Sequence, residues 1–143
     1  MNTFDKLTPE IINKLKHNEI FVFGSNTKGL HGGGAAYYAT QFFGAAWGIS
    51  EGLTGNTYAI PTCTPEIEKV GINELKSSID RFIQYAIENH ALNFLVTPIG
   101  CGIAGWGVDE VAPMFESAKS LPNVSLPESF WKYFFEIKIN KQK

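Results

Sequence analysis

Glycines are concentrated in two short stretches of the chain. The function that these stretches predict most clearly is ligand binding by backbone N–H groups. Of the 14 glycines, nine lie between residues 24 and 55 and four lie between residues 100 and 107. The run at residues 32–34 stands directly before a predicted helix, so several N–H groups and the positive end of the helix dipole can face one point. This arrangement binds an anion without arginine, and a diphosphate is the expected ligand. The alternative is that these glycines only form tight turns.

The second stretch contains a match to the G-x-G-x-x-G pattern of dinucleotide-binding Rossmann units. Gly100, Gly102 and Gly105 supply its glycines after a predicted strand. Trp106 and Gly107 delay the next predicted helix, which in such units begins at once, and Ser125 stands about twenty residues on, where such units place an acid. A Rossmann-like nucleotide binder therefore remains an alternative, whereas the Gly-x4-Gly-Lys-Ser/Thr pattern of a P-loop is absent from the sequence.

Three residues of the glycine stretches could do acid, base or nucleophilic chemistry. Cys101 follows a predicted strand, but its neighbours do not match the nucleophile elbow, and a structural thiol is the preferred interpretation. His31 and Glu51 are the candidate acid or base, and the alternative is that both are exposed and inert. The three histidines and the scattered acids lack the spacing of metal ligands, so we expect no metal site and no cofactor.

The elements around these stretches predict an α/β domain with three layers and a largely parallel central sheet. Residues 19–23 and 94–99 are apolar runs typical of buried strands, and residues 58–62 and 124–126 are shorter strands. Pro61 places its strand at an end or edge position. Helices are predicted at residues 8–17, 35–43, 72–87 and from Asp109 to about residue 121. Loops at the carboxyl ends of parallel strands form ligand sites, so both glycine stretches are predicted to share one cleft.

Composition limits the class of protein and its partners. Hydrophobic residues make up 44% and charged residues 18%, which predicts one domain over residues 1–143, with a core at about 8–131 and a flexible tail at 138–143. The net charge is −2 and Arg81 is the only arginine, so nucleic acid is not an expected partner. Short apolar runs and two cysteines predict a cytoplasmic protein with free thiols and no membrane partner. The oligomeric state is left open.

Three segments of the sequence resemble the ligand-binding loops of macrodomains, which bind ADP-ribose and sometimes remove it. These are Val-Phe-Gly-Ser-Asn at 22–26, Gly-Gly-Gly-Ala-Ala at 32–36 and Thr-Pro-Ile-Gly-Cys-Gly-Ile-Ala-Gly at 97–105. Residues 20–34, 58–62 and 126–131 look still more similar to a group of uncharacterised bacterial and phage proteins related to macrodomains. That resemblance spans residues 19–131 and implies a macrodomain-like fold that binds ADP-ribose or a related nucleotide diphosphate-sugar.

The resemblance also implies a set of ligand-binding residues. Residues 32–34 would approach the distal ribose and the diphosphate, 100–105 would hold the diphosphate from the other side, and Asn26 matches one asparagine of the first loop. From its place after a strand, the Asn26 side chain is expected to point into the cleft, and the alternative is a bond to its own backbone two residues on. Trp106 could cover a sugar or base with its ring. The full predicted set is Gly24, Ser25, Asn26, Gly32, Gly33, Gly34, Gly100, Cys101, Gly102, Ile103, Ala104, Gly105 and Trp106.

Departures from the family pattern bear on catalysis. Ala35, Ala36 and Ala104 occupy positions where hydrolytic macrodomains place an aspartate, and the aspartate that holds the adenine amine has no clear counterpart near Asn18 and Glu19. Binding is therefore the expected function. The alternatives are an ADP-ribosyl glycohydrolase or deacylase using His31 or Glu51, and a phage or host interaction protein that retains the fold without a nucleotide.

Overall fold

The structure, a computed structural model, describes residues 6–142, and its sheet is built around strand β1 (Glu19–Asn26). Side chains of β1 alternate between two hydrophobic cores. Ile20 and Val22 belong to the larger core, and Phe21 and Phe23 to the smaller. The strand predicted at residues 19–23 is confirmed, and it continues through Asn26 because β3 supplies parallel partners along that extension.

Four further strands complete a five-stranded mixed sheet in the order β2-β3-β1-β4-β5. The pairs β3/β1, β1/β4 and β4/β5 are parallel, as the sequence predicts, and β2 pairs antiparallel with β3. β2 is a three-residue strand that sequence reasoning missed. The bounds are β2 (Gly52–Thr54), β3 (Thr57–Cys63), β4 (Asn93–Val96) and β5 (Val124–Ser125).

Pro61 lies where its strand has one neighbour only. The antiparallel partners of β2 end at Ala59, whereas Pro61 pairs in register with Ser25 of β1. Proline has no backbone N–H, and this costs no hydrogen bond of the sheet on a side where the strand has no neighbour. The expected end position therefore holds for Pro61, although β3 itself lies inside the sheet.

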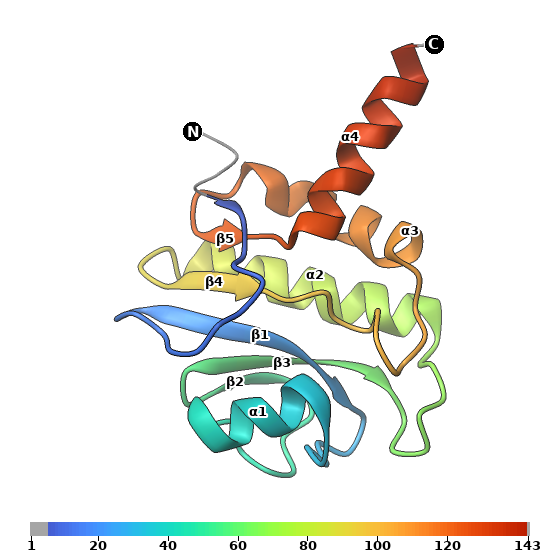
Figure 1. The fold of residues 1–143 in the computed structure, drawn as a ribbon. Coiled ribbons are helices and arrows are strands. Elements are labelled where there is room, and N and C mark those ends of the chain that lie inside the picture. Colours follow the sequence, from blue (N-terminus) through green and yellow to red (C-terminus); the bar gives the residue numbers. More distant parts are fainter. Residues whose placement is uncertain (1–5, 143) are drawn as a thin grey trace.

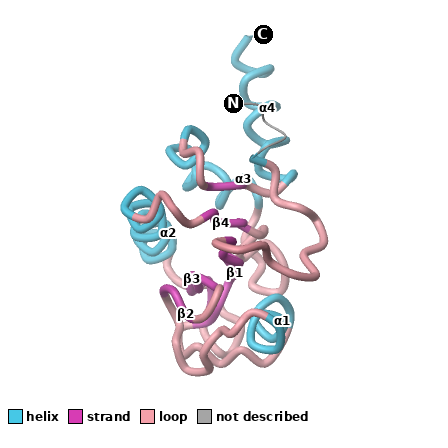
Figure 2. Tube along the Cα trace, turned by 90° about the vertical axis from the view of Figure 1, so that its left-hand side faces the viewer, coloured by secondary structure: helices cyan, strands magenta, loops and turns pink. Residues whose placement is uncertain are grey.

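Helices cover both faces of the sheet, which gives a single α/β domain with three layers. Figure 2 shows α1 (Gly34–Phe42) on one side of the strands and α2 (Ile72–Glu88) on the other. Both helices are confirmed within one residue of their predicted bounds. The buried residues of α2 recur at steps of three and four, as expected for a helix with one apolar face. They are Leu75, Ser78, Ile79, Phe82, Ile83 and Ala86.

The helix predicted at residues 8–17 is wrong. Thr8 donates its backbone N–H to the carbonyl of Leu126 at 2.9 Å, and Leu126 donates to the carbonyl of Lys6 at the same distance. The N-terminal segment therefore lies beside the chain that follows β5, and the turn before β1 places Asn18 at φ 70°. Pairing with a distant segment outweighs the local capping signal.

The C-terminal part differs from the prediction at three points. The strand predicted at residues 94–99 ends earlier, because the chain after β4 leaves the sheet at Thr97. The helix predicted from Asp109 has Gly107 as its N-cap. It consists of α3 (Val108–Val111) followed by the 3₁₀ helix η2 (Ala112–Ser120). Residues 138–142, for which the sequence predicts a flexible tail, are helical and continue α4 (Glu128–Gln142), and residue 143 lies outside the described residues. Buried Phe130 and Phe134 anchor α4, whose far end projects from the domain in Figure 1. No helix within residues 6–142 has the length and apolarity of a membrane span.

Candidate functional site

A cleft of about 570 Å³ opens where β1, β3 and β4 end. Residues at the ends of all three parallel strands and in the loops after them line it, and they include glycines of both glycine stretches. This is the arrangement expected for loops at the carboxyl edge of a parallel sheet. The lining comprises Gly24, Ser25, Asn26, Leu30, Gly32, Gly33, Gly34, Ala35, Ala36, Thr62, Cys63, Thr64, Pro65, Ile67, Thr97, Pro98, Ile99, Gly100, Gly102, Ile103 and Ala104.

Five of the singled-out residues lie outside this lining: His31, Glu51, Cys101, Gly105 and Trp106. Sequence reasoning in turn missed residues 62–65, which form one wall of the cleft. Thr62 and Cys63 end β3, a direct neighbour of β1, and the next two residues follow it, so the rule that located the other two loops could have found them.

The glycines of the cleft fall into two groups with different physical roles. A Cβ at Gly100 would lie 2.9 Å from Cδ1 of Trp106, and its φ of 71° also excludes most side chains, so the fold itself requires this glycine. At Gly32, Gly33 and Gly102 a Cβ would meet no heavy atom of the described residues within 4 Å, and no left-handed φ occurs. Neither packing nor backbone strain explains glycine at these three positions.

Unpaired backbone donors accompany the open glycines. Helix α1 begins without a side-chain cap and without an acid in its first turn. Among the described residues, the N–H groups of Gly34, Ala35 and Ala36 have no acceptor, and neither do those of Gly102 and Ile103 in the second loop. The cleft thus combines a positive helix end with donors from a second loop, and no charged side chain lines it.

Asn26 lines the cleft, but its amide stabilises the first loop. The Oδ1 atom accepts hydrogen bonds from the N–H groups of Lys28 at 3.2 Å and Leu30 at 3.0 Å, and Nδ2 donates to the Leu30 carbonyl at 2.8 Å. The bond two residues on, which the sequence left as the alternative, is therefore present. The expectation of an amide directed into the cleft is corrected, because the tight loop supplies partners for both of its ends.

His31 is buried, so the alternative that it is exposed is wrong. Its side chain has 0% exposure, with Nε2 3.0 Å from the Ala46 carbonyl. The ring packs edge-on against Phe23 and Trp47, with ring centroids 5.3 and 6.2 Å away. His31 holds the first loop to residues 46–47 from within the fold, and Gly48 strengthens this contact by donating to the Gly29 carbonyl at 2.8 Å.

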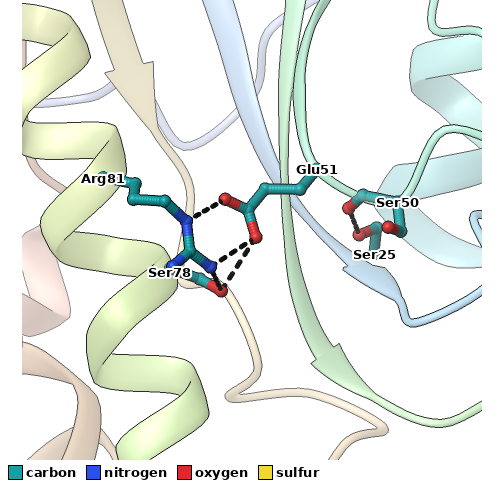
Figure 3. Close-up of polar contacts among 5 residues, drawn as sticks. All are labelled: Ser25, Ser50, Glu51, Ser78 and Arg81. Carbon is teal, nitrogen blue, oxygen red and sulfur yellow. Dashed lines mark hydrogen bonds and ion pairs between the residues drawn. The ribbon is translucent and has the colours of Figure 1, made fainter.

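Glu51 joins the edge of the sheet to helix α2. Figure 3 shows its carboxylate facing Arg81, whose Nε donates to Oε2 at 2.6 Å and whose Nη2 donates to Oε1 at 2.9 Å. Ser78 also donates to Oε1, at 3.0 Å. The hydrogen bond from Arg81 is the main reason that the pKa of Glu51 is lowered. Next to Glu51, the Ser50 carbonyl accepts from the Ser25 hydroxyl, so this edge is also tied to the end of β1.

Replacement of Glu51 by glutamine should lower the free energy of unfolding by about 1 kcal/mol at neutral pH, because Arg81 is largely exposed and solvent screens the pair. A lowered folded-state pKa stabilises the protein above the unfolded pKa, near 4.3 for glutamate, and this stabilisation disappears as the pH falls through the folded value. Urea unfolding of both proteins from pH 7 to pH 3 measures the difference, which should shrink toward acid. A constant difference would contradict the role of the ion pair.

Trp106 anchors the second loop from inside. The ring is 5% exposed, and its Nε1 donates to the Thr62 carbonyl at 2.8 Å, while its backbone N–H donates to the Gly100 carbonyl at the same distance. Trp106 therefore ties the loop after β4 to the end of β3, within the larger core. The stretch around it is rich in glycine, which is typical of an exposed loop, so the sequence gave no signal that the ring turns inward.

Cys101 is a half-buried free thiol beside the cleft. Burial, followed by the negative charges of Glu110 and Asp109, raises its pKa to about 11. A thiol with this pKa holds little thiolate at neutral pH, so the structure favours the predicted structural role over a nucleophilic one.

Iodoacetamide should alkylate Cys101 at pH 8 at least about ten times more slowly in the folded protein than in urea, because little thiolate is present. Mass spectrometry of the peptide that contains Cys101 measures the rate, and Cys101→Ser identifies the signal. Equal rates in the folded and unfolded protein would contradict the raised pKa.

A second and larger cavity, of about 870 Å³, adjoins the cleft. The two share Gly34, Ala35, Thr97 and Pro98. The rest of the second cavity is lined by residues 7–13, Phe21, Tyr38 and residues 127–129. Sequence reasoning missed it because residues 8–17 were expected to be helical, whereas they pass beside the start of α4.

Comparisons with protein-family models, with curated proteins and with solved structures found no match to this chain, so they assign it to no family.

Proposed function

We propose that the chain binds ADP-ribose or a related nucleotide diphosphate-sugar, with the diphosphate between residues 32–36 and 100–104. The observation that carries the proposal is the open space at Gly32, Gly33 and Gly102, where the fold requires no glycine. Without side chains there, phosphate oxygens can approach the backbone donors to about 3 Å. A ligand that needs this approach explains glycine at positions where internal packing does not.

The electrostatics of the cleft favour an anion held by hydrogen bonds. Its lining has no acidic side chain to repel phosphate and no basic side chain to pair with it. The N-terminus of α1 and the free donors of both loops supply the compensating partial charge.

The adjoining cavity supports a nucleotide rather than a simple phosphate as the ligand. It is mostly apolar, and because it shares four residues with the cleft, a nucleoside attached to a diphosphate in the cleft can enter it. The resemblance of the glycine loops to macrodomains points to the same ligand class. His31 and Glu51 lie outside the cleft, so neither favours the hydrolase alternative.

Calorimetry and amide NMR shifts with ADP-ribose, NAD and AMP test the proposal. ADP-ribose should bind more tightly than AMP, and the largest shifts should fall at residues 32–36 and 102–104. A lack of shifts in these loops with all three ligands at millimolar concentration would exclude the proposed function.

A further inference from the structure

Ile67 lies in the wall of the cleft with a backbone conformation that isoleucine rarely adopts. Its φ is 64°, in the left-handed region, where a β-branched side chain crowds the backbone. Residues 64–68 form a closed turn around it. The N–H of Thr64 donates to the Glu68 carbonyl at 2.7 Å, and the N–H of Ile67 donates to the Thr64 carbonyl at 2.9 Å. Turns usually have glycine or asparagine at a left-handed position.

The side chain of Ile67 does not contribute to the packing of the fold. The residue is 48% exposed and belongs to neither hydrophobic core. Strained residues persist mainly at functional sites, where a contact with a ligand offsets their cost. Because Ile67 lines the cleft, its strained position indicates a contact with a ligand bound there.

Two further apolar side chains line the cleft and are exposed, Leu30 at 40% and Ile103 at 82%. We call Leu30, Ile67 and Ile103 the apolar rim. The loop after each of the three parallel strands β1, β3 and β4 contributes one of its residues. Single exposed apolar residues are common on protein surfaces, but three that line one uncharged cleft favour a ligand with an apolar face.

The order of the strands places Ile67 and the second cavity on different sides of β1. Strand β1 lies between β3 and β4. Ile67 follows β3, whereas the second cavity is lined by Thr97 and Pro98 after β4, and no residue of the apolar rim lines that cavity. A nucleotide with its nucleoside in the second cavity and its diphosphate in the cleft therefore directs its terminal sugar toward Ile67.

We propose that the apolar rim binds a ring attached to the terminal ribose of the ligand, so that NAD, whose terminal ribose carries nicotinamide, binds more tightly than ADP-ribose. A terminal ribose alone presents hydroxyls and would leave the rim in water, whereas the flat face of nicotinamide can cover apolar side chains. Glu66 and Glu68, the chain neighbours of Ile67, are exposed and acidic, which suits the positive charge of the nicotinamide ring. This inference rests on the proposed function for the position of the diphosphate.

Calorimetry and amide NMR shifts with NAD and ADP-ribose test the apolar rim. NAD should bind about tenfold more tightly, and its shifts should include residues 64–68. Ile67→Asn should weaken NAD binding about fivefold and change ADP-ribose binding less than about twofold. It should also raise the melting temperature, because asparagine tolerates the left-handed φ. Ile67→Leu keeps an apolar side chain at the rim and should bind NAD as the wild type does.

Ile87→Asn is the matched control, because Ile87 is 50% exposed and lines neither cavity. The same substitution there should leave both affinities unchanged. Its melting temperature should not rise, since Ile87 lies within helix α2 and has no strain to lose.

Gly33→Glu distinguishes failure of this inference from failure of the proposed function. If Gly33→Glu abolishes binding of both ligands, but NAD and ADP-ribose bind the wild type within about twofold of each other, the rim proposal is overturned and the proposed function stands. If NAD binding is weakened by Ile67→Asn but not by Gly33→Glu, the proposed function fails and the contact between the ring and the rim stands. A rise in melting temperature for Ile67→Asn without loss of NAD affinity would show strain without a ligand contact and would overturn the rim proposal.

Discussion

Replacement of Gly33 by glutamate should weaken binding of ADP-ribose at least about a hundredfold while the domain stays folded. The new carboxylate would stand beside the N-terminus of α1, where we expect phosphate oxygens, and it would both fill the space and repel the anion. Folding should be unaffected, because the site is open and the extended φ of −158° at Gly33 suits any residue. Calorimetry measures the affinity, and thermal unfolding measures the stability.

Two variants separate the causes of that effect. Gly33→Ala adds one methyl group without charge and should reduce affinity far less than Gly33→Glu. Ser77→Glu makes the same change in net charge on the exposed face of α2, away from the cleft, and should bind as the wild type does. Undiminished binding by Gly33→Glu would show that the diphosphate does not lie at this loop.

Trp106→Ala should lower the free energy of unfolding by about 3–5 kcal/mol, the range for removal of a large aromatic side chain from a core. The ring is buried, and its loss leaves the Thr62 carbonyl with only the longer hydrogen bond from the Val70 N–H, at 3.2 Å. Urea denaturation monitored by circular dichroism measures this loss. Ligand binding should fall as well, since the second loop loses its anchor to β3.

Trp106→Phe provides the control, because it keeps most of the ring volume and removes the hydrogen bond. Its destabilisation should be smaller, about 1 kcal/mol, the net contribution of one hydrogen bond, because the Val70 N–H still donates to the Thr62 carbonyl. If instead both variants kept wild-type stability and lost only ligand affinity, the ring would act as a ligand contact, which is the role that the sequence suggested.

Elements with a strong local pattern were predictable from the sequence. Helix α2 repeats its apolar residues at helical spacing over 17 residues, and β1 begins as a continuous apolar run, so local burial requirements determine both. The short strand β2 and the N-terminal segment lack such a pattern. Each takes its conformation from a partner: β3 for the first, and the chain after β5 for the second.

The surroundings of the side chains proposed for chemistry could not be predicted from the local sequence either. His31, Glu51 and Trp106 all stand in glycine-containing stretches, where exposure is the usual expectation. In the fold, His31 enters the core, Glu51 meets an arginine 30 residues away, and Trp106 reaches the end of another strand. Each contact depends on how separate segments pack, and no local spacing encodes it.

The sequence by itself determined the α/β order and the two glycine stretches, and the rule for parallel strands then placed both stretches at one edge of the sheet. Only the tertiary structure decided which glycines the fold needs, because the space around a missing Cβ depends on distant atoms such as those of Trp106. Only the tertiary structure formed the second cavity, whose walls come from residues 7–13 and 127–129. Those segments meet because their backbones pair, and long-range pairing leaves no periodic signal in either one.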